Sequence, residues 1–78
     1  MNNQLNTAEF IGVGIAYHRK MKGYTQECFA ELLNVDVRSV RAWEGSEFMP
    51  RLERLIEICN VLGIEIGSLI CLADNAAF

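Results

Sequence analysis

The sequence predicts an all-α domain of five short helices, and three observations support this fold class. Apolar residues recur at spacings of three, four and seven along five segments, as they do on one face of a helix. Residues that favour helix ends separate these segments, and no segment shows the alternation of a half-buried strand. The 78 residues, 51% of them apolar, suit one compact domain, with its core expected over residues 8–72 and a tail over 73–78.

The first helix is expected over residues 8–22. Thr7 is its predicted N-cap, Glu9 lies in the first turn, where a carboxylate suits the helix dipole, and Gly23 ends the helix. The stripe that would face the core consists of Phe10, Ile11, Ile15, His18 and Met21. Two glycines inside the segment each weaken it by about 1 kcal/mol relative to Ala, unless a neighbouring helix packs closely against them.

Two helices of similar length follow, joined by about three residues. Thr25 is the predicted cap of a helix over residues 26–33, and Asp36 of a helix that runs to Glu44. The inward residues of the first of these are expected to be Phe29, Ala30, Leu32 and Leu33. Asn34 occupies the turn, where it tolerates a positive φ. The spacing is typical of a helix-turn-helix motif, whose short helices depend on tertiary packing.

The stretch "GSEFMP" is expected to form a turn and loop before the last two helices. The fourth helix is expected over residues 51–62, ending at Gly63, and a short fifth over residues 66–72. The buried residues of the fourth helix are predicted to be Leu52, Leu55, Ile56, Cys59 and Leu62.

The third helix divides into two faces at 100° per residue. The inward face consists of Asp36, Val40 and Trp43. The outward face consists of Arg38, Arg41 and Ala42. Periodicity alone leaves two interpretations open: an ordinary solvated face, whose arginines pair with Asp36 and Glu44, or a binding face.

The formal charge of −3 hides an uneven distribution of the basic residues. All seven Lys and Arg lie between Arg19 and Arg54, together with six acids, so that stretch carries 7 − 6 = +1. One positive face is therefore compatible with the acidic total. The sequence contains neither a membrane-spanning stretch nor the plan of a signal peptide, so a cytoplasmic location is expected.

Neither an enzyme nor a metal protein is expected. His18 is the only histidine, and the odd set of Cys28, Cys59 and Cys71 matches no zinc or redox spacing. The last two cysteines fall within apolar helical patterns and are expected to be buried thiols. Cys28 has acidic neighbours, which suggest an exposed helix face, so its burial is left open. We therefore expect no cofactor and no small-molecule ligand.

The stretch "TQECFAELLNVDVRSVRAWE" resembles the Cro/repressor type of helix-turn-helix DNA-binding domain, the Xre family. The matching positions are Gln26, Ala30, Leu33, Val35, Val40, Trp43 and Glu44. The resemblance extends over residues 10–72 and implies a lambda-repressor-like fold of five helices. The sequence departs from the family pattern at four positions, namely Asn34, Gly45, Arg51 and Glu65.

The resemblance also implies a set of site residues. It places the helix of residues 36–44 in the major groove, where an arginine can donate two parallel hydrogen bonds to guanine. The base-reading candidates are Val37, Arg38, Arg41 and Ala42. The DNA-backbone candidates are Lys22, Thr25, Gln26, Ser39 and Arg51. Arg19 and Glu44 match a pair that joins the first and third helices as a salt bridge in family members.

Double-stranded DNA is the expected partner, and the expected function is a sequence-specific transcription regulator, a repressor on a short inverted repeat. One motif reads few base pairs, so a homodimer through the C-terminal helix is expected. Its interface is predicted to use Ile64, Ile66, Leu69, Ile70, Leu72 and Phe78. The alternative is a protein-interaction module on the same fold, an antitoxin or adaptor, which the acidic balance favours and the paired arginines oppose.

Overall fold

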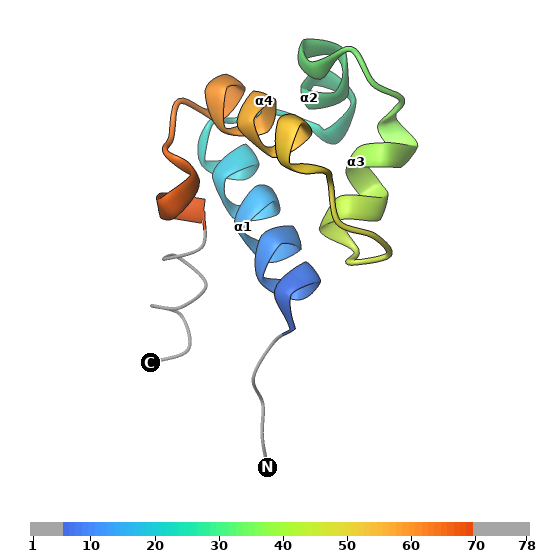
Figure 1. The fold of residues 1–78 in the computed structure, drawn as a ribbon. Helices are drawn as coiled ribbons and strands as arrows, with labels where there is room; N and C mark the ends of the chain where they lie inside the picture. Colours follow the sequence, from blue (N-terminus) through green and yellow to red (C-terminus); the bar gives the residue numbers. More distant parts are fainter. Residues whose placement is uncertain (1–5, 70–78) are drawn as a thin grey trace.

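The computed structural model describes residues 6–69, which form a small helical domain (Figure 1). The helices are α1 (Thr7–Met21), α2 (Gln26–Leu33), α3 (Val37–Glu44) and α4 (Leu52–Leu62). A further helical turn over residues 66–69 reaches the end of the described chain and lies within the predicted fifth helix. Between residues 6 and 69 there is no strand, so the all-α prediction is confirmed.

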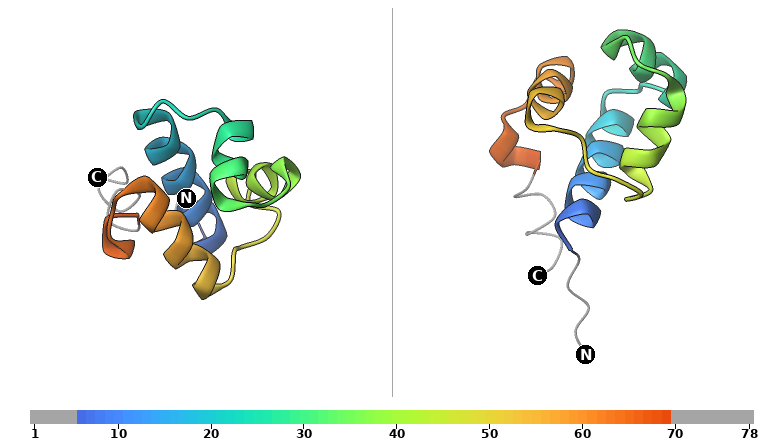
Figure 2. Two further views of the ribbon diagram at one scale, coloured as in Figure 1. Left: turned by 90° about the horizontal axis from the view of Figure 1, so that it is seen from above. Right: turned by 45° about the vertical axis from the view of Figure 1, so that its right-hand side comes forward.

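The helices surround α1, which lies in the middle of the molecule (Figure 2). The pair α2 and α3 lies on one side of α1, the turn of residues 66–69 on the other, and α4 contacts both α1 and α2. The fully buried side chains of the core are Ile15, Phe29, Val40, Ile58, Leu62 and Leu69. No helix of the described part is long and apolar enough to cross a membrane.

The helix caps follow the predictions at α2 and α3 and differ at α1. Thr25 accepts a hydrogen bond from the backbone N–H of Cys28 at 3.0 Å, and Asp36 accepts one from that of Arg38 at 2.9 Å. The N-cap of α1 is Asn6, so the prediction of Thr7 is wrong. Asn6 and Glu9 cap each other reciprocally, each side chain accepting from the other's backbone N–H at 2.9 Å.

At the start of α4, Arg51 occupies the N-cap position without a capping hydrogen bond from its side chain, and the helix begins at Leu52. At the end of α2, Asn34 adopts the left-handed conformation with φ of 58°, as predicted for the turn. The connection between the two helices of the motif is therefore tight without a glycine.

The two glycines of α1 mark close contacts with other segments. A Cβ on Gly12 would lie 2.6 Å from the carbonyl oxygen of Trp43, and one on Gly14 would lie 2.8 Å from that of Leu69. The close packing that could offset the low helix propensity of these glycines is thus present. α3 and the 66–69 turn both approach the backbone of α1.

Some predicted core residues are exposed instead. Four apolar side chains lie at the edge of the apolar face of their helix, where no neighbouring segment within residues 6–69 covers them. These exposed residues are Met21, Leu32, Leu52 and Ile56. Ile58, which the prediction missed, is fully buried. The burial of α4 is centred on the side that faces α1 and α2 because those are its packing partners.

The predicted interface residues near the chain end do not all remain available to a partner. Leu69 is fully buried, with its side chain beside Gly14, so in the free chain it belongs to the core. Ile64 is half-buried against the core, and Ile66 is exposed. The remaining candidates, Ile70, Leu72 and Phe78, and the rest of the predicted fifth helix lie outside the described residues.

Candidate nucleic-acid interface

The predicted helix-turn-helix motif is built as two short helices packed on each other and on α1. α2 packs against α3, and the N–H of Val35 donates to the carbonyl of Ala30 at 3.0 Å across the turn. Val40 and Trp43 bury the inward side of α3, and Phe29 and Ala30 bury that of α2. Each helix has only eight residues, so this packing, not helix propensity, holds them in place.

Arg38 and Arg41 lie on the outward face of α3, as the helical spacing predicts, whereas Asp36, which was expected on the inward face, is exposed. Their side chains are 85% and 53% exposed. Each is paired with a carboxylate in the free chain, Arg38 with Asp36 at 3.4 Å and Arg41 with Glu27 at 3.2 Å. Water and salt screen pairs this exposed, so they add little to folding stability, and each guanidinium group can still reach a further partner.

The other predicted base-reading residues are not equally placed. Ala42 is only 7% exposed, so the prediction that it shares the outward face is wrong. The chain turns back after α3, where the N–H of Glu47 donates to the Ala42 carbonyl at 2.9 Å. Val37 is half-buried against the core, with only part of its side chain at the surface.

Behind the outward face, a buried ion pair ties α3 to α1. Arg19 donates from Nε and Nη2 to the two carboxylate oxygens of Glu44, at 2.6 and 3.1 Å. Nη1 of Arg19 donates to the carbonyl of Tyr24 at 2.8 Å, and Gln26 Nε2 donates to Glu44 at 3.0 Å. The side chains of Arg19 and Glu44 are 9% and 8% exposed. The predicted bridge is therefore a bidentate salt bridge that is shielded from solvent.

Gln26 extends this network to the surface. Its Oε1 accepts from Nε of Arg41 at 3.4 Å, while its amide nitrogen donates to Glu44. A continuous chain of polar contacts therefore runs from Arg19 on α1, through Glu44 and Gln26, to an arginine on the outer face of α3.

The sequence profile of the helix-turn-helix family matches residues 15–69, which is most of the chain. The chain belongs to the Cro/repressor-type helix-turn-helix family. This membership supports a DNA-binding transcription regulator, and α3 is the second helix of the motif. No curated protein matches the sequence.

Two crystal structures of the clp gene regulator ClgR from Corynebacterium glutamicum share the fold, each with a TM-score of 0.86 and 22% sequence identity. One alignment covers 94% of this chain and 95% of that chain, and the other covers 92% and 77%. The similarity confirms the helix-turn-helix fold over nearly the whole chain.

The predicted backbone contacts lie at different distances from the recognition helix. Thr25 and Gln26 are at the N-terminus of α2, next to Arg41, and Ser39 is on the recognition helix itself. The amino group of Lys22 lies 3.5 Å from where a Cβ on Gly63 would be, at the C-terminus of α4.

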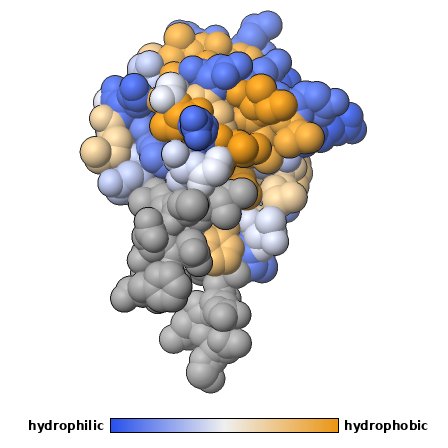
Figure 3. All heavy atoms as spheres, turned by 60° about the vertical axis from the view of Figure 1, so that its left-hand side comes forward, coloured by the Kyte–Doolittle hydropathy of each residue, from blue (hydrophilic) through white to orange (hydrophobic). Residues whose placement is uncertain are grey.

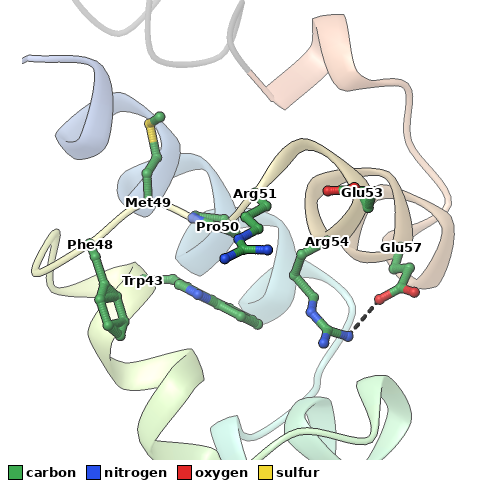
Figure 4. A pocket seen from close by; sticks show the side chains of 8 residues that line it. All are labelled: Trp43, Phe48, Met49, Pro50, Arg51, Glu53, Arg54 and Glu57. Carbon is green, nitrogen blue, oxygen red and sulfur yellow. Dashed lines mark hydrogen bonds and ion pairs between the residues drawn. The ribbon is translucent and has the colours of Figure 1, made fainter.

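The segment after the recognition helix forms an open groove with the start of α4 (Figure 4). Trp43, Phe48 and Met49 line one side, and Arg51 and Arg54 the other. Arg54 is paired with Glu57 at 2.6 Å, whereas Arg51 forms no ion pair within residues 6–69. Arg51 is therefore the more available cation for a phosphate on this side of the molecule.

The remaining reactive groups show no catalytic arrangement in the described part of the chain. No cluster of metal-ligating side chains occurs within residues 6–69. His18 packs edge-on against Tyr17, and its Nε2 is buried without a hydrogen-bond partner among residues 6–69. Burial raises the pKa of the Cys59 thiol, whereas Cys28 is exposed; Cys71 lies outside the described residues.

Sequence reasoning missed Glu27 as part of this surface. Its carboxylate comes from α2, fourteen positions before Arg41, and reaches the arginine because α2 packs across the recognition helix. Spacing along a single helix could not reveal this pair. The sequence signal that was present, an acid directly after Gln26 at the start of α2, is also what the helix dipole alone would favour.

Proposed function

We propose that this chain is a sequence-specific regulator of transcription that reads the major groove of double-stranded DNA with α3. One observation carries the proposal: Arg38 and Arg41 are exposed together on the outward face of a recognition helix that a buried ion pair ties to α1. A side chain that reads bases must sit on a helix of fixed orientation, and the bridge between Arg19 and Glu44 supplies that fixation.

The chemistry of the two arginines suits guanine. A guanidinium donates two parallel hydrogen bonds to O6 and N7, and each such contact discriminates against a wrong base by about 1–3 kcal/mol. Thr25, Gln26, Ser39 and Arg51 would position the domain through phosphate contacts, with Lys22 as a more distant candidate. The exposed part of Val37 would contact a base edge at the start of the helix.

The proposal includes a homodimer that acts as a repressor on a short inverted repeat. A single recognition helix reads only a few base pairs, so useful affinity calls for two. In Figure 3, hydrophobic surface gathers on the face where α4 and the turn of residues 66–69 come forward. Exposed apolar residues on these segments include Leu52, Ile56 and Ile66. Sedimentation that shows only monomer at tens of micromolar would reject the dimer.

Such a protein works without a cofactor, a small-molecule ligand or a catalysed reaction, and it would act in the cytoplasm. Repression would follow from occupancy of the site, and the level of the protein itself would set that occupancy. We propose the absence of a cofactor, a ligand and a catalysed reaction together with DNA binding, because contacts between α3 and DNA need none of them.

Selection of bound sequences from random DNA tests the proposal. We expect enrichment of one short motif with guanines at fixed positions, bound at nanomolar affinity and weakened steeply by salt. Arg38→Met and Arg41→Met should each relax the preference at one position, whereas Lys22→Met should at most weaken all DNA alike. A random library that yields no motif would contradict the proposal and favour a protein partner on the same fold.

A further inference from the structure

Both outward arginines of α3 are held by a neighbouring carboxylate along the same edge of the guanidinium group. Nε and Nη2 of Arg38 face the two oxygens of Asp36, each at 3.4 Å. Nε of Arg41 faces Gln26 Oε1 at 3.4 Å, and its Nη2 faces Glu27 Oε2 at 3.2 Å. In both cases the edge formed by Nε and Nη2 is occupied, and the edge formed by Nη1 and Nη2 has no partner among residues 6–69.

We propose that Glu27 and Asp36 are positioning residues that determine sequence specificity by fixing how Arg41 and Arg38 present their guanidinium groups to guanine. This inference rests on the proposed function. A guanidinium can offer either of two edges for a two-bond contact with O6 and N7. With one edge held by an acid of the protein, the base meets the other, and the arginine has fewer orientations in which it can bind a wrong partner.

The placement of these acids is otherwise unfavourable for a DNA-binding surface. A carboxylate beside the contact face repels phosphates and lowers affinity for every DNA sequence. Neither acid is needed to neutralise a buried arginine, because the side chains of both arginines and both acids are at least half exposed. Such an acid can still orient the arginine. The contact between them becomes stronger once DNA binding removes water from it.

Asp36 has a backbone contact besides the guanidinium group of Arg38, and Glu27 occupies a position that its own helix favours. Asp36 is also the N-cap of α3, where its Oδ1 accepts from the backbone N–H of Arg38, so the carboxylate cannot rotate away with the guanidinium. Glu27 lies in the first turn of α2, a position that the helix dipole favours for an acid. Gln26, which shares Arg41 with Glu27, is held in turn by Glu44.

The test is a comparison of Glu27→Ala with Glu31→Ala. Glu31 lies one turn further along α2, is exposed, and forms no ion pair with any residue from 6 to 69. Both variants remove one negative charge from the same helix. The readout is a discrimination ratio, the Kd for a duplex with one base pair changed divided by the Kd for the selected duplex. The changed base pair is the one that Arg41→Met makes tolerant.

We expect both variants to bind all DNA more tightly, because each loses a charge that repels phosphate. Only Glu27→Ala should lower the discrimination ratio, by about two- to fivefold, the range for an exposed pair. In an Arg41→Met background, Glu27→Ala should leave the ratio unchanged, because the residue acts through Arg41. Asp36→Asn, which keeps a good N-cap, should act in the same way on the base pair that Arg38 reads.

Three results would overturn the inference while the proposed function stands. These are an unchanged ratio in Glu27→Ala, an equal loss in Glu31→Ala, and a loss in Glu27→Ala that persists without Arg41. If Arg41→Met relaxes no position, Arg41 reads no base and the inference also falls. A wild-type protein without any sequence preference would instead overturn the proposed function itself.

Discussion

Replacing Glu44 by Gln tests whether the buried pair with Arg19 holds the recognition helix in place. Both side chains are less than 10% exposed, and the guanidinium donates to both carboxylate oxygens. Removal of one partner leaves an uncompensated charge in a shielded site, which destabilises by about 3–5 kcal/mol. A domain of 78 residues has a total stability of about 4–12 kcal/mol, so the change removes a large part of it.

Urea unfolding followed by circular dichroism measures this loss, with Glu57→Gln as the matched control. Glu57 is paired with Arg54 at a comparable 2.6 Å, but on the surface, so its loss should stay below about 1 kcal/mol. The double variant Arg19→Met/Glu44→Met should be more stable than the sum of the single changes implies, because it leaves no unpaired charge. Equal losses in Glu44→Gln and Glu57→Gln would refute the reasoning.

Three further predictions follow from the structure. Gly12→Ala should lower stability by more than 1 kcal/mol despite the higher helix propensity of Ala, because the new Cβ meets a carbonyl oxygen of α3; Gly67→Ala, in open space, should not, and equal behaviour would contradict the close contact. The Arg38 backbone N–H, and then its guanidinium, lower the pKa of Asp36 below 3.8. The ionised carboxylate therefore contributes to folding stability above that value, and this contribution is lost as the pH falls through the folded-state pKa. In urea titrations the difference in stability between the wild type and Asp36→Asn should close at acid pH, and a constant difference would exclude this linkage. Cys28 should be alkylated well before Cys59, whose thiol is buried with a raised pKa, as peptide mass spectrometry can show; equal rates would count against that burial.

The two helices of the motif were predictable to the residue because their ends depend on local chemistry. Thr25 and Asp36 are caps whose side chains bond within three residues, and Asn34 tolerates the left-handed turn. The start of α1 was missed although its signal is also local. An Asn followed three residues later by Glu has capping-box spacing, and that places the cap at Asn6.

Errors in the predicted faces arose where packing partners decide burial. A helical wheel shows which residues share a face of a helix, but it does not show how much of that face the neighbouring helices cover. Leu52 and Ile56 therefore stayed exposed, and Ile58 became buried. Ala42 is buried although its spacing groups it with the two arginines, so its burial depends on tertiary packing that periodicity within the helix does not contain.

The outward position of the two arginines was predictable, and so was Asp36 as a partner of Arg38, but Glu27 as the partner of Arg41 was not. Arg38 and Arg41 follow from the spacing on one helix, and the bridge of Arg19 with Glu44 follows from the family resemblance. The contact of Arg41 with Glu27 depends on the way α2 packs against α3, which only the three-dimensional structure defines. The spacing on one helix shows two arginines on the same face, and the structure adds the carboxylates that lie against them.

The most direct test of the central claim is the affinity for a selected DNA site relative to a scrambled duplex at about 0.15 M salt, for the wild type and for Arg38→Met/Arg41→Met. We predict a ratio of about a thousandfold or more for the wild type. In the variant the ratio should fall at least tenfold, because two base contacts are lost while most phosphate contacts remain. A variant that keeps the wild-type ratio would contradict the assignment of α3 as the reading helix.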